Sequence, residues 1–146
     1  MKHKKLLCGL IGLLVVGFAL LSCVDSWYHK PQNVFERNKD LLNDIAEQYM
    51  ENGNLQYPTI AGIEQVTVWN GTNPIIEFMT SGFGIAPGSQ YYGFYYSVNG
   101  TPVAYQGTDV KLELQDDGWW EWHGNGDNGG RTKQIEGNWY IFEAHF

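Results

Sequence analysis

Cysteine is nearly absent from this chain of 146 residues, and its only two positions, Cys8 and Cys23, both lie near the N-terminus. Residues 24–146 therefore cannot form an internal disulfide, the crosslink on which many small secreted domains depend. A domain in this region must be stabilised by its own apolar core. The 124 residues from Cys23 onward suffice for one such domain and are few for two.

Several catalytic motifs are missing as well. The chain has no GxSxG or SxxK motif to supply a serine nucleophile and no HExxH zinc motif. Its glycine-rich loops lack the lysine and following Ser or Thr that hold a phosphate. Acyl transfer therefore has no visible nucleophile, and no cofactor is expected. These absences favour a binding protein over an enzyme and leave the question of catalysis open.

Basic residues are scarce: Lys and Arg number 9 against 16 Asp and Glu. Three of the lysines, Lys2, Lys4 and Lys5, precede an apolar run over residues 6–22. Without that leader six basic residues remain, and the net charge is −10 with neutral histidines. Such a charge argues against nucleic acid as a partner and against direct adsorption to anionic lipids.

The leader has the form of a secretory signal peptide, in which a positive start is followed by an apolar run. The run ends in Leu20-Leu21-Ser22-Cys23, which resembles the lipobox of bacterial lipoproteins. The resemblance implies cleavage after Ser22 and attachment of acyl chains, such as palmitate, to the Cys23 sulfur. It implies a lipid anchor on the extracytoplasmic face of the cell membrane, and it names no family for the rest of the chain.

Two other fates are compatible with the same leader. Residues 6–24 approach the roughly 18 to 20 apolar residues that cross a bilayer, so the leader could be an uncleaved signal anchor. An ordinary cleaved signal is the other alternative. All three place the rest of the chain outside the cytoplasm. Residues 23–32, which include Pro31, would then form a lipidated tether before a single globular domain over residues 33–146.

The domain begins with a helical pattern. Asn33 and Glu36 have the spacing of a capping box, and apolar residues recur at helical intervals from Val34 to Tyr49. Gly53 provides a stop signal. We expect one amphipathic helix over residues 33–51.

From residue 60 onward, short β-type runs alternate with turn residues. Asn70-Gly71 and Asn99-Gly100 are typical two-residue hairpin turns. The second turn would pair Tyr96 with Val103 and Phe94 with Tyr105. The segment over residues 80–90, rich in glycine, is expected to be a flexible connection.

A third hairpin is predicted at Asp116-Asp117-Gly118, with a three-residue loop in which Gly118 is left-handed. This register opposes Leu114 with Trp120 and Leu112 with Trp122. It buries both tryptophans, and it turns outward a set of neighbouring side chains: Lys111, Glu113, Trp119, Glu121 and His123.

Strands over residues 131–136 and 139–146, joined by a tight turn at Gly137-Asn138, complete the pattern. The fold class is therefore α+β. We expect one N-terminal amphipathic helix packed on an antiparallel meander sheet of about six to eight strands, open or partly closed into a barrel.

Candidate chemistry is confined to a few polar residues. Glu121-Trp122-His123 and Glu143-Ala144-His145 each place a carboxylate and an imidazole on one strand face, a ligand pair that suits zinc. A strand between them would separate the pairs by roughly 10 Å, too far for one ion, so no metal site is expected. The loop over residues 123–130 lacks the distal glutamate of a calcium-binding EF-hand.

Glu113 and Glu121 would face each other across the third hairpin. Paired carboxylates can flank a glycosidic bond, and their repulsion would raise one pKa. A small cell-envelope hydrolase that uses Glu113 and Glu121, or His123, is therefore the alternative function.

Aromatic residues are abundant, with six Trp, nine Tyr and seven Phe. Most would fill a small β core, but the expected registers turn some outward for recognition. The leading hypothesis is a membrane-anchored, non-catalytic binding or protective module for a protein, peptide or glycan, with a signal-anchored envelope-complex subunit as a further alternative. Its expected binding residues are Tyr91, Tyr95, Glu113, Trp119, Glu121 and His123.

Overall fold

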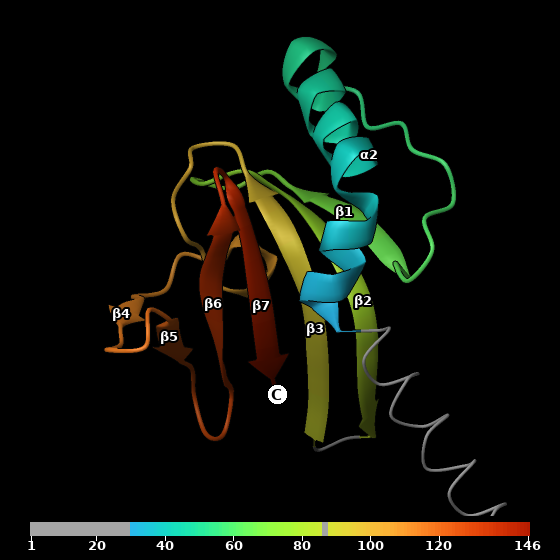
Figure 1. Cartoon of the computed structure of the whole chain (residues 1–146). Helices are drawn as coiled ribbons and strands as arrows, with labels where there is room; N and C mark the ends of the chain where they lie inside the picture. The colour runs from blue at the N-terminus through green and yellow to red at the C-terminus, as the bar shows by residue number, and fades with distance from the viewer. Residues whose placement is uncertain (1–29, 86–87) are drawn as a thin grey trace, which may run out of the picture.

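The computed structural model describes residues 30–85 and 88–146, so the expected signal peptide, the lipobox and most of the expected tether lie outside the described residues. One helix, α2 (Pro31–Asn52), packs on a seven-stranded antiparallel sheet that is not closed into a barrel (Figure 1). The predicted α+β class is confirmed. Along the sheet the strands lie in the order β1-β2-β3-β7-β6-β5-β4. Their bounds are β1 Gln65–Trp69, β2 Ile75–Ile85, β3 Gly88–Ser97, β4 Glu113–Leu114, β5 Trp120–His123, β6 Gly129–Glu136 and β7 Trp139–His145.

Helix α2 begins two residues earlier than its capping-box pattern indicates. Lys30 occupies the N-cap position and Pro31 the first turn, where its fixed φ suits a helix start and its missing N–H costs nothing. Asn33 therefore lies inside the helix, and its prediction as the N-cap is wrong. The stop at Gly53 is confirmed, because its φ is 69° and its N–H donates to the Tyr49 carbonyl oxygen over 2.8 Å.

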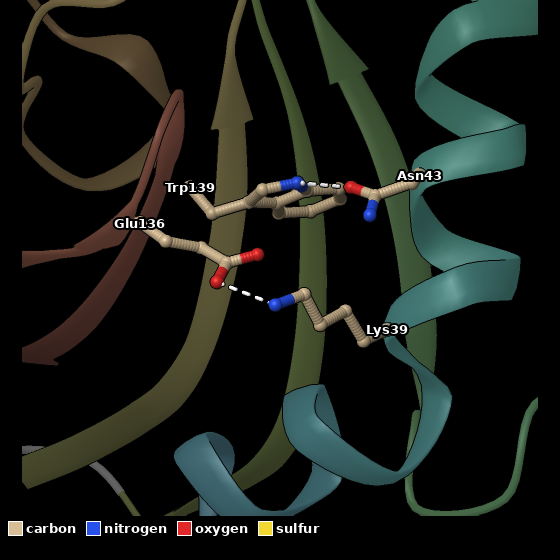
Figure 2. Close-up of polar contacts among 4 residues, drawn as sticks. All are labelled: Lys39, Asn43, Glu136 and Trp139. Atoms are coloured by element: carbon tan, nitrogen blue, oxygen red, sulfur yellow. Dashed lines mark hydrogen bonds and ion pairs between the residues drawn. The ribbon is translucent and has the colours of Figure 1, made fainter.

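The buried face of α2 covers one end of the sheet. Its side chains pack against β2, β3 and β7 in a single cluster with Ile76, Phe78, Phe94 and Trp139. At the centre, Phe35 meets Phe94 edge to face, with ring centroids 5.6 Å apart. Two polar contacts tie the helix to the sheet (Figure 2): the Trp139 indole N–H donates to Asn43 Oδ1 over 2.8 Å, and Lys39 Nζ lies 2.6 Å from Glu136 Oε2.

The hairpin expected at Asn99-Gly100 does not form, although the chain does turn there. Gly100 has a φ of 69° and its N–H donates to the Ser97 carbonyl oxygen over 3.1 Å. Residues 101–112 then leave the sheet, and β3 pairs with β7 instead, with Phe94 beside Ile141. We call residues 98–112 the crossover segment, because they carry the chain from β3 to β4 at the far edge.

Tyr95 fixes the crossover segment to the face of the sheet opposite α2, which we call the second face. The Tyr95 hydroxyl accepts a hydrogen bond from the Val103 N–H over 2.9 Å and donates to the Val103 carbonyl oxygen over 3.2 Å. It also lies 2.9 Å from Thr132 Oγ1 on β6. Because this side chain satisfies the backbone of Val103, the segment needs no strand partner there. The second face is thereby buried beneath Val103, Ala104 and Tyr105.

The other predicted turns are closer to the structure. Gly118 has a φ of 81°, and Leu114 lies opposite Trp120, so the three-residue loop and its register are confirmed. However, β4 is only two residues long, so the expected pairing of Leu112 with Trp122 is not part of the sheet. Trp122 is buried as expected, whereas Trp120 is only half-buried. Asn70-Gly71 does connect an antiparallel pair, β1 and β2, through the longer loop of residues 70–74.

A buried carboxylate lies beneath the crossover segment. Glu77 of β2 is 5 % exposed, and its Oε2 accepts the backbone N–H of Gln106 over 3.1 Å. Gln106 has a φ of 58° and is the one non-glycine residue with positive φ among the described residues. Burial raises the pKa of Glu77 from 4.5 to about 7, although the Gln106 hydrogen bond opposes the shift.

This pKa shift makes stability depend on pH in a defined direction. Because the folded-state pKa exceeds the ordinary value, the contribution of Glu77 is most favourable below pH 4.5 and is lost as the pH rises through about 7. Glu77→Gln keeps an oxygen acceptor for Gln106 and removes the charge. We therefore expect the unfolding free energy of this variant minus that of the unmodified protein to increase by about 3 kcal/mol from pH 4.5 to pH 8.

Urea unfolding at both pH values measures this difference. The exposed Glu64→Gln substitution is the control and is expected to show no comparable change. A difference between Glu77→Gln and the unmodified protein that stays constant with pH would contradict the prediction.

Candidate functional site

Helix α2 leaves part of its own side of the sheet uncovered, over β5, β6 and the adjoining ends of β2, β3 and β7 (Figure 1). Two rows of side chains cross this region, because directly opposed residues in an antiparallel sheet point to the same face. One row comprises Phe83, Gln90, His145, Gly129 and His123. The next comprises Ser81, Tyr92, Glu143, Arg131, Glu121 and Glu113. We call these two rows, together with Trp119, the open face.

An ion pair and a stacked ring organise the centre of the open face. Arg131 Nε donates to Glu143 Oε2 over 2.9 Å, and its Nη2 lies 2.8 Å from the same oxygen. The guanidinium carbon of Arg131 lies 4.4 Å from the centroid of the Trp119 ring, while Lys133 Nζ lies 5.9 Å from it. Trp119 therefore points to the predicted side of the sheet, but two cations approach its ring.

The two Glu-x-His steps flank β6, as their predicted separation by an intervening strand requires. A Cβ atom added at Gly129 would lie 3.1 Å from both Cε1 and Nε2 of His145, so this imidazole extends over the β6 backbone. A shallow depression of about 200 Å³ results, lined by Glu121, His123, Arg131, Glu143 and His145. Within residues 30–85 and 88–146, no group of three His, Cys, Asp or Glu side chains could hold a metal ion.

A larger cleft of about 630 Å³ adjoins this depression at the end of the sheet. Its walls are the β2–β3 hairpin, with Phe83 and Gln90, and the loop of residues 125–128, with His145 shared between cleft and depression. The loop is ordered by its own backbone, since Gly124 N–H donates to the Asn128 carbonyl oxygen over 2.8 Å. Phe83 is 79 % exposed, and the described lining contains Asp127 but no Lys or Arg.

Two of the expected binding residues lie on the wrong face. Tyr95 is 1 % exposed and holds the crossover segment, so its prediction as an outward aromatic residue is wrong. Tyr91 is half-buried on the same second face and stacks on Tyr105 with centroids 5.3 Å apart. The cause is alternation along β3: Phe94 and its neighbours on one face meet α2, which sends the intervening tyrosines beneath the crossover segment.

The carboxylate pair is assembled as predicted but is not electrostatically suited to acid catalysis. Glu113 lies directly opposite Glu121. However, Lys111 Nζ binds Glu113 Oε1 over 2.8 Å, and this contact lowers the pKa of Glu113 instead of raising it. Glu121 and His123 line the depression, whereas Glu113 lies outside its lining.

The sequence interpretation missed Phe83, Gln90 and Tyr92 as members of the site. Phe83 and Gln90 belong to the segment over residues 80–90 that was expected to be a flexible connection, but residues 80–85 continue β2 and residues 88–90 begin β3. Tyr92 Oη donates to Gln90 Oε1 over 2.8 Å, which orders the row beside the cleft. The alternation of Gln90, Tyr92 and Phe94 was the available signal, and the glycines around them obscured it.

None of the helices in the described part of the chain is long and apolar enough to cross a membrane, and the apolar run of residues 6–22 lies outside that part. No family model, curated protein or solved structure matches the chain.

Proposed function

We propose that the chain is a membrane-tethered, extracytoplasmic binding protein that holds a glycan at the cleft and open face. The location rests on the basic and apolar leader and on the lipobox-like Leu20-Leu21-Ser22-Cys23. The binding role rests on one observation above all: a cleft of about 630 Å³ opens directly onto an uncovered polar sheet face. Its volume lies in the range of small-ligand sites.

The lining chemistry favours a saccharide. Planar side chains that both donate and accept hydrogen bonds, such as Gln90, Asn125 and Asn128, match arrays of sugar hydroxyls. Phe83 presents a ring that is 79 % exposed, and such an apolar face can cover the C–H side of a sugar ring. Because the described lining has no Lys or Arg, an anionic ligand would lack a counter-charge in the cleft.

A hydrolase role gains less support from the same region. Of the expected carboxylate pair Glu113 and Glu121, Glu113 forms an ion pair with Lys111. The neighbouring carboxylate of Glu143 is likewise paired, with Arg131. A retaining or inverting glycosidase needs one carboxyl group with a raised pKa as the acid, and Glu113 is shifted the opposite way.

Phe83→Ala tests the proposed recognition surface. The side chain is exposed, so we expect its loss to change the unfolding free energy by no more than about 0.5 kcal/mol. We expect the affinity for a bound oligosaccharide to fall by about tenfold or more, as for an aromatic residue at the centre of a binding site. Titration calorimetry against a panel of defined neutral oligosaccharides provides the measurement.

Leu114→Ala is the matched control, because Leu114 is 62 % exposed on β4 at the far edge of the sheet. It is expected to leave affinity unchanged. Equal losses in both variants, or binding of peptides but of no saccharide, would contradict the glycan assignment.

Cys23→Ser tests the proposed anchor. Because the acyl chains would be carried on the Cys23 sulfur, this variant should incorporate no labelled palmitate and should leave the membrane fraction or remain unprocessed. Cys8→Ser is the control and should be labelled normally, since Cys8 lies within the leader. Undiminished labelling of the Cys23→Ser protein would refute the lipoprotein proposal.

A further inference from the structure

The two edges of the sheet differ in how they are protected against pairing. Edge strand β4 is only two residues long and is flanked by charged side chains such as Lys111 and Asp116. Edge strand β1 has the sequence Gln-Val-Thr-Val-Trp, with no proline, no charge and no irregularity in its register with β2. Soluble proteins ordinarily protect such an edge with one of these features. Strand β1 is therefore an available template for another strand.

The outer side of β1 carries backbone groups without a strand partner. A terminal strand directs the N–H and C=O groups of alternate residues away from its one neighbour. Among the described residues, the backbone hydrogen bonds of loops and turns include none to residues 65–69. In Figure 1 the connection from α2 to β1 runs outward before it enters the strand.

The sequence of β1 is nearly palindromic about Thr67. This symmetry favours β1 of a second copy as the strand that pairs with its outer side. Antiparallel pairing with an identical strand about a two-fold axis at Thr67 would oppose Val66 with Val68 and Gln65 with Trp69. Val66 and Val68 both lie on the α2 side, beside Phe78 and Ile76, so the opposed valines would form an apolar cross-strand contact. One step further out, Glu64 would meet Asn70, so no like charges are opposed.

We propose that β1 pairs with β1 of a second copy of this chain, antiparallel about a two-fold axis at Thr67, to form a dimer with one continuous sheet. A depression of about 170 Å³ lies beside Val66, lined in part by Tyr57, Ile60 and Ile63. It would adjoin the Val68 side chain of the second copy. The acidic domains repel each other at long range, so added salt strengthens the dimer.

Cross-linking at the axis tests the proposed register. Thr67→Cys is introduced into the full chain with Cys8→Ser and Cys23→Ser, so that it supplies the sole thiol. Opposed residues in an antiparallel pair bring their Cβ atoms to about 4.5–5.5 Å, within reach of a disulfide after a small adjustment. Mild oxidation in detergent is expected to give mainly disulfide-linked dimer, detected by non-reducing electrophoresis.

Thr72→Cys in the same background is the matched control, because Thr72 is exposed in the β1–β2 loop away from the axis. It is expected to cross-link at least tenfold more slowly. Equal rates for the two variants, or a Thr67→Cys protein that stays monomeric, would overturn the proposal.

A charge placed at the axis tests the association itself. Thr67→Lys would set two lysines against each other, and we expect the association constant from sedimentation velocity to fall at least tenfold. Thr72→Lys adds the same charge elsewhere and should have little effect, and higher salt should raise association of the unsubstituted Cys8→Ser/Cys23→Ser chain. Because these measurements involve neither acyl chains nor oligosaccharide, their outcome is independent of the proposed function. Association unaffected by Thr67→Lys would place any dimer interface elsewhere.

Discussion

The hydroxyl of Tyr95 holds the crossover segment against the sheet, and the order of the strands depends on that attachment. A single buried phenol satisfies both the N–H and the carbonyl of Val103 while it contacts Thr132 on β6. Residues 98–112 therefore lie over the second face and do not add a strand to the sheet. The place beside β3 is left to β7, and the C-terminal strands then continue outward from β7 to β4.

The two faces of the sheet carry different side chains because different elements cover them. The second face is covered by the crossover segment, and its buried side chains are mainly aromatic and aliphatic, with Glu77 and Thr132 as buried polar members. The opposite face is covered by α2 at one end only, where Phe35 and Trp139 meet. Beyond the helix, β3 and β7 carry Tyr92 and Glu143 on this face, and the adjoining β6 and β5 carry Arg131 and Glu121. A polar open face is therefore compatible with a stable core, because on β2, β3 and β7 the two occupy different lengths of the strands.

Local sequence signals predicted the parts of the fold that local interactions determine. The helix with its Gly53 stop, the Gly118 loop and the β6–β7 hairpin all follow from turn chemistry and periodicity. The β3–β7 pairing could not be predicted in the same way, because a turn at Asn99-Gly100 is compatible with either a hairpin or a departure from the sheet. Tertiary burial decides between them, and only it reveals that Tyr95 belongs to the interior.

The candidate site was predicted in part for the same reason. Glu121, His123 and Trp119 were assigned to the correct side of the sheet because they belong to a short hairpin whose register is fixed locally. Phe83 and Gln90 were missed because they become neighbours of His145 only through pairing between distant strands.

The consecutive glycines of β6, Gly129 and Gly130, lie between a side chain of the open face and a side chain of the core. A Cβ atom at Gly130 would lie 2.8 Å from the Trp122 indole nitrogen, while at Gly129 it would lie 3.1 Å from the His145 ring. The Trp122 indole and the His145 imidazole therefore lie on opposite faces of β6, with only the backbone of Gly129 and Gly130 between them. A displacement of the buried indole would shift the strand on which the imidazole lies. The alignment of the open face is therefore sensitive to substitutions at Trp122, a residue that no ligand on the open face would touch.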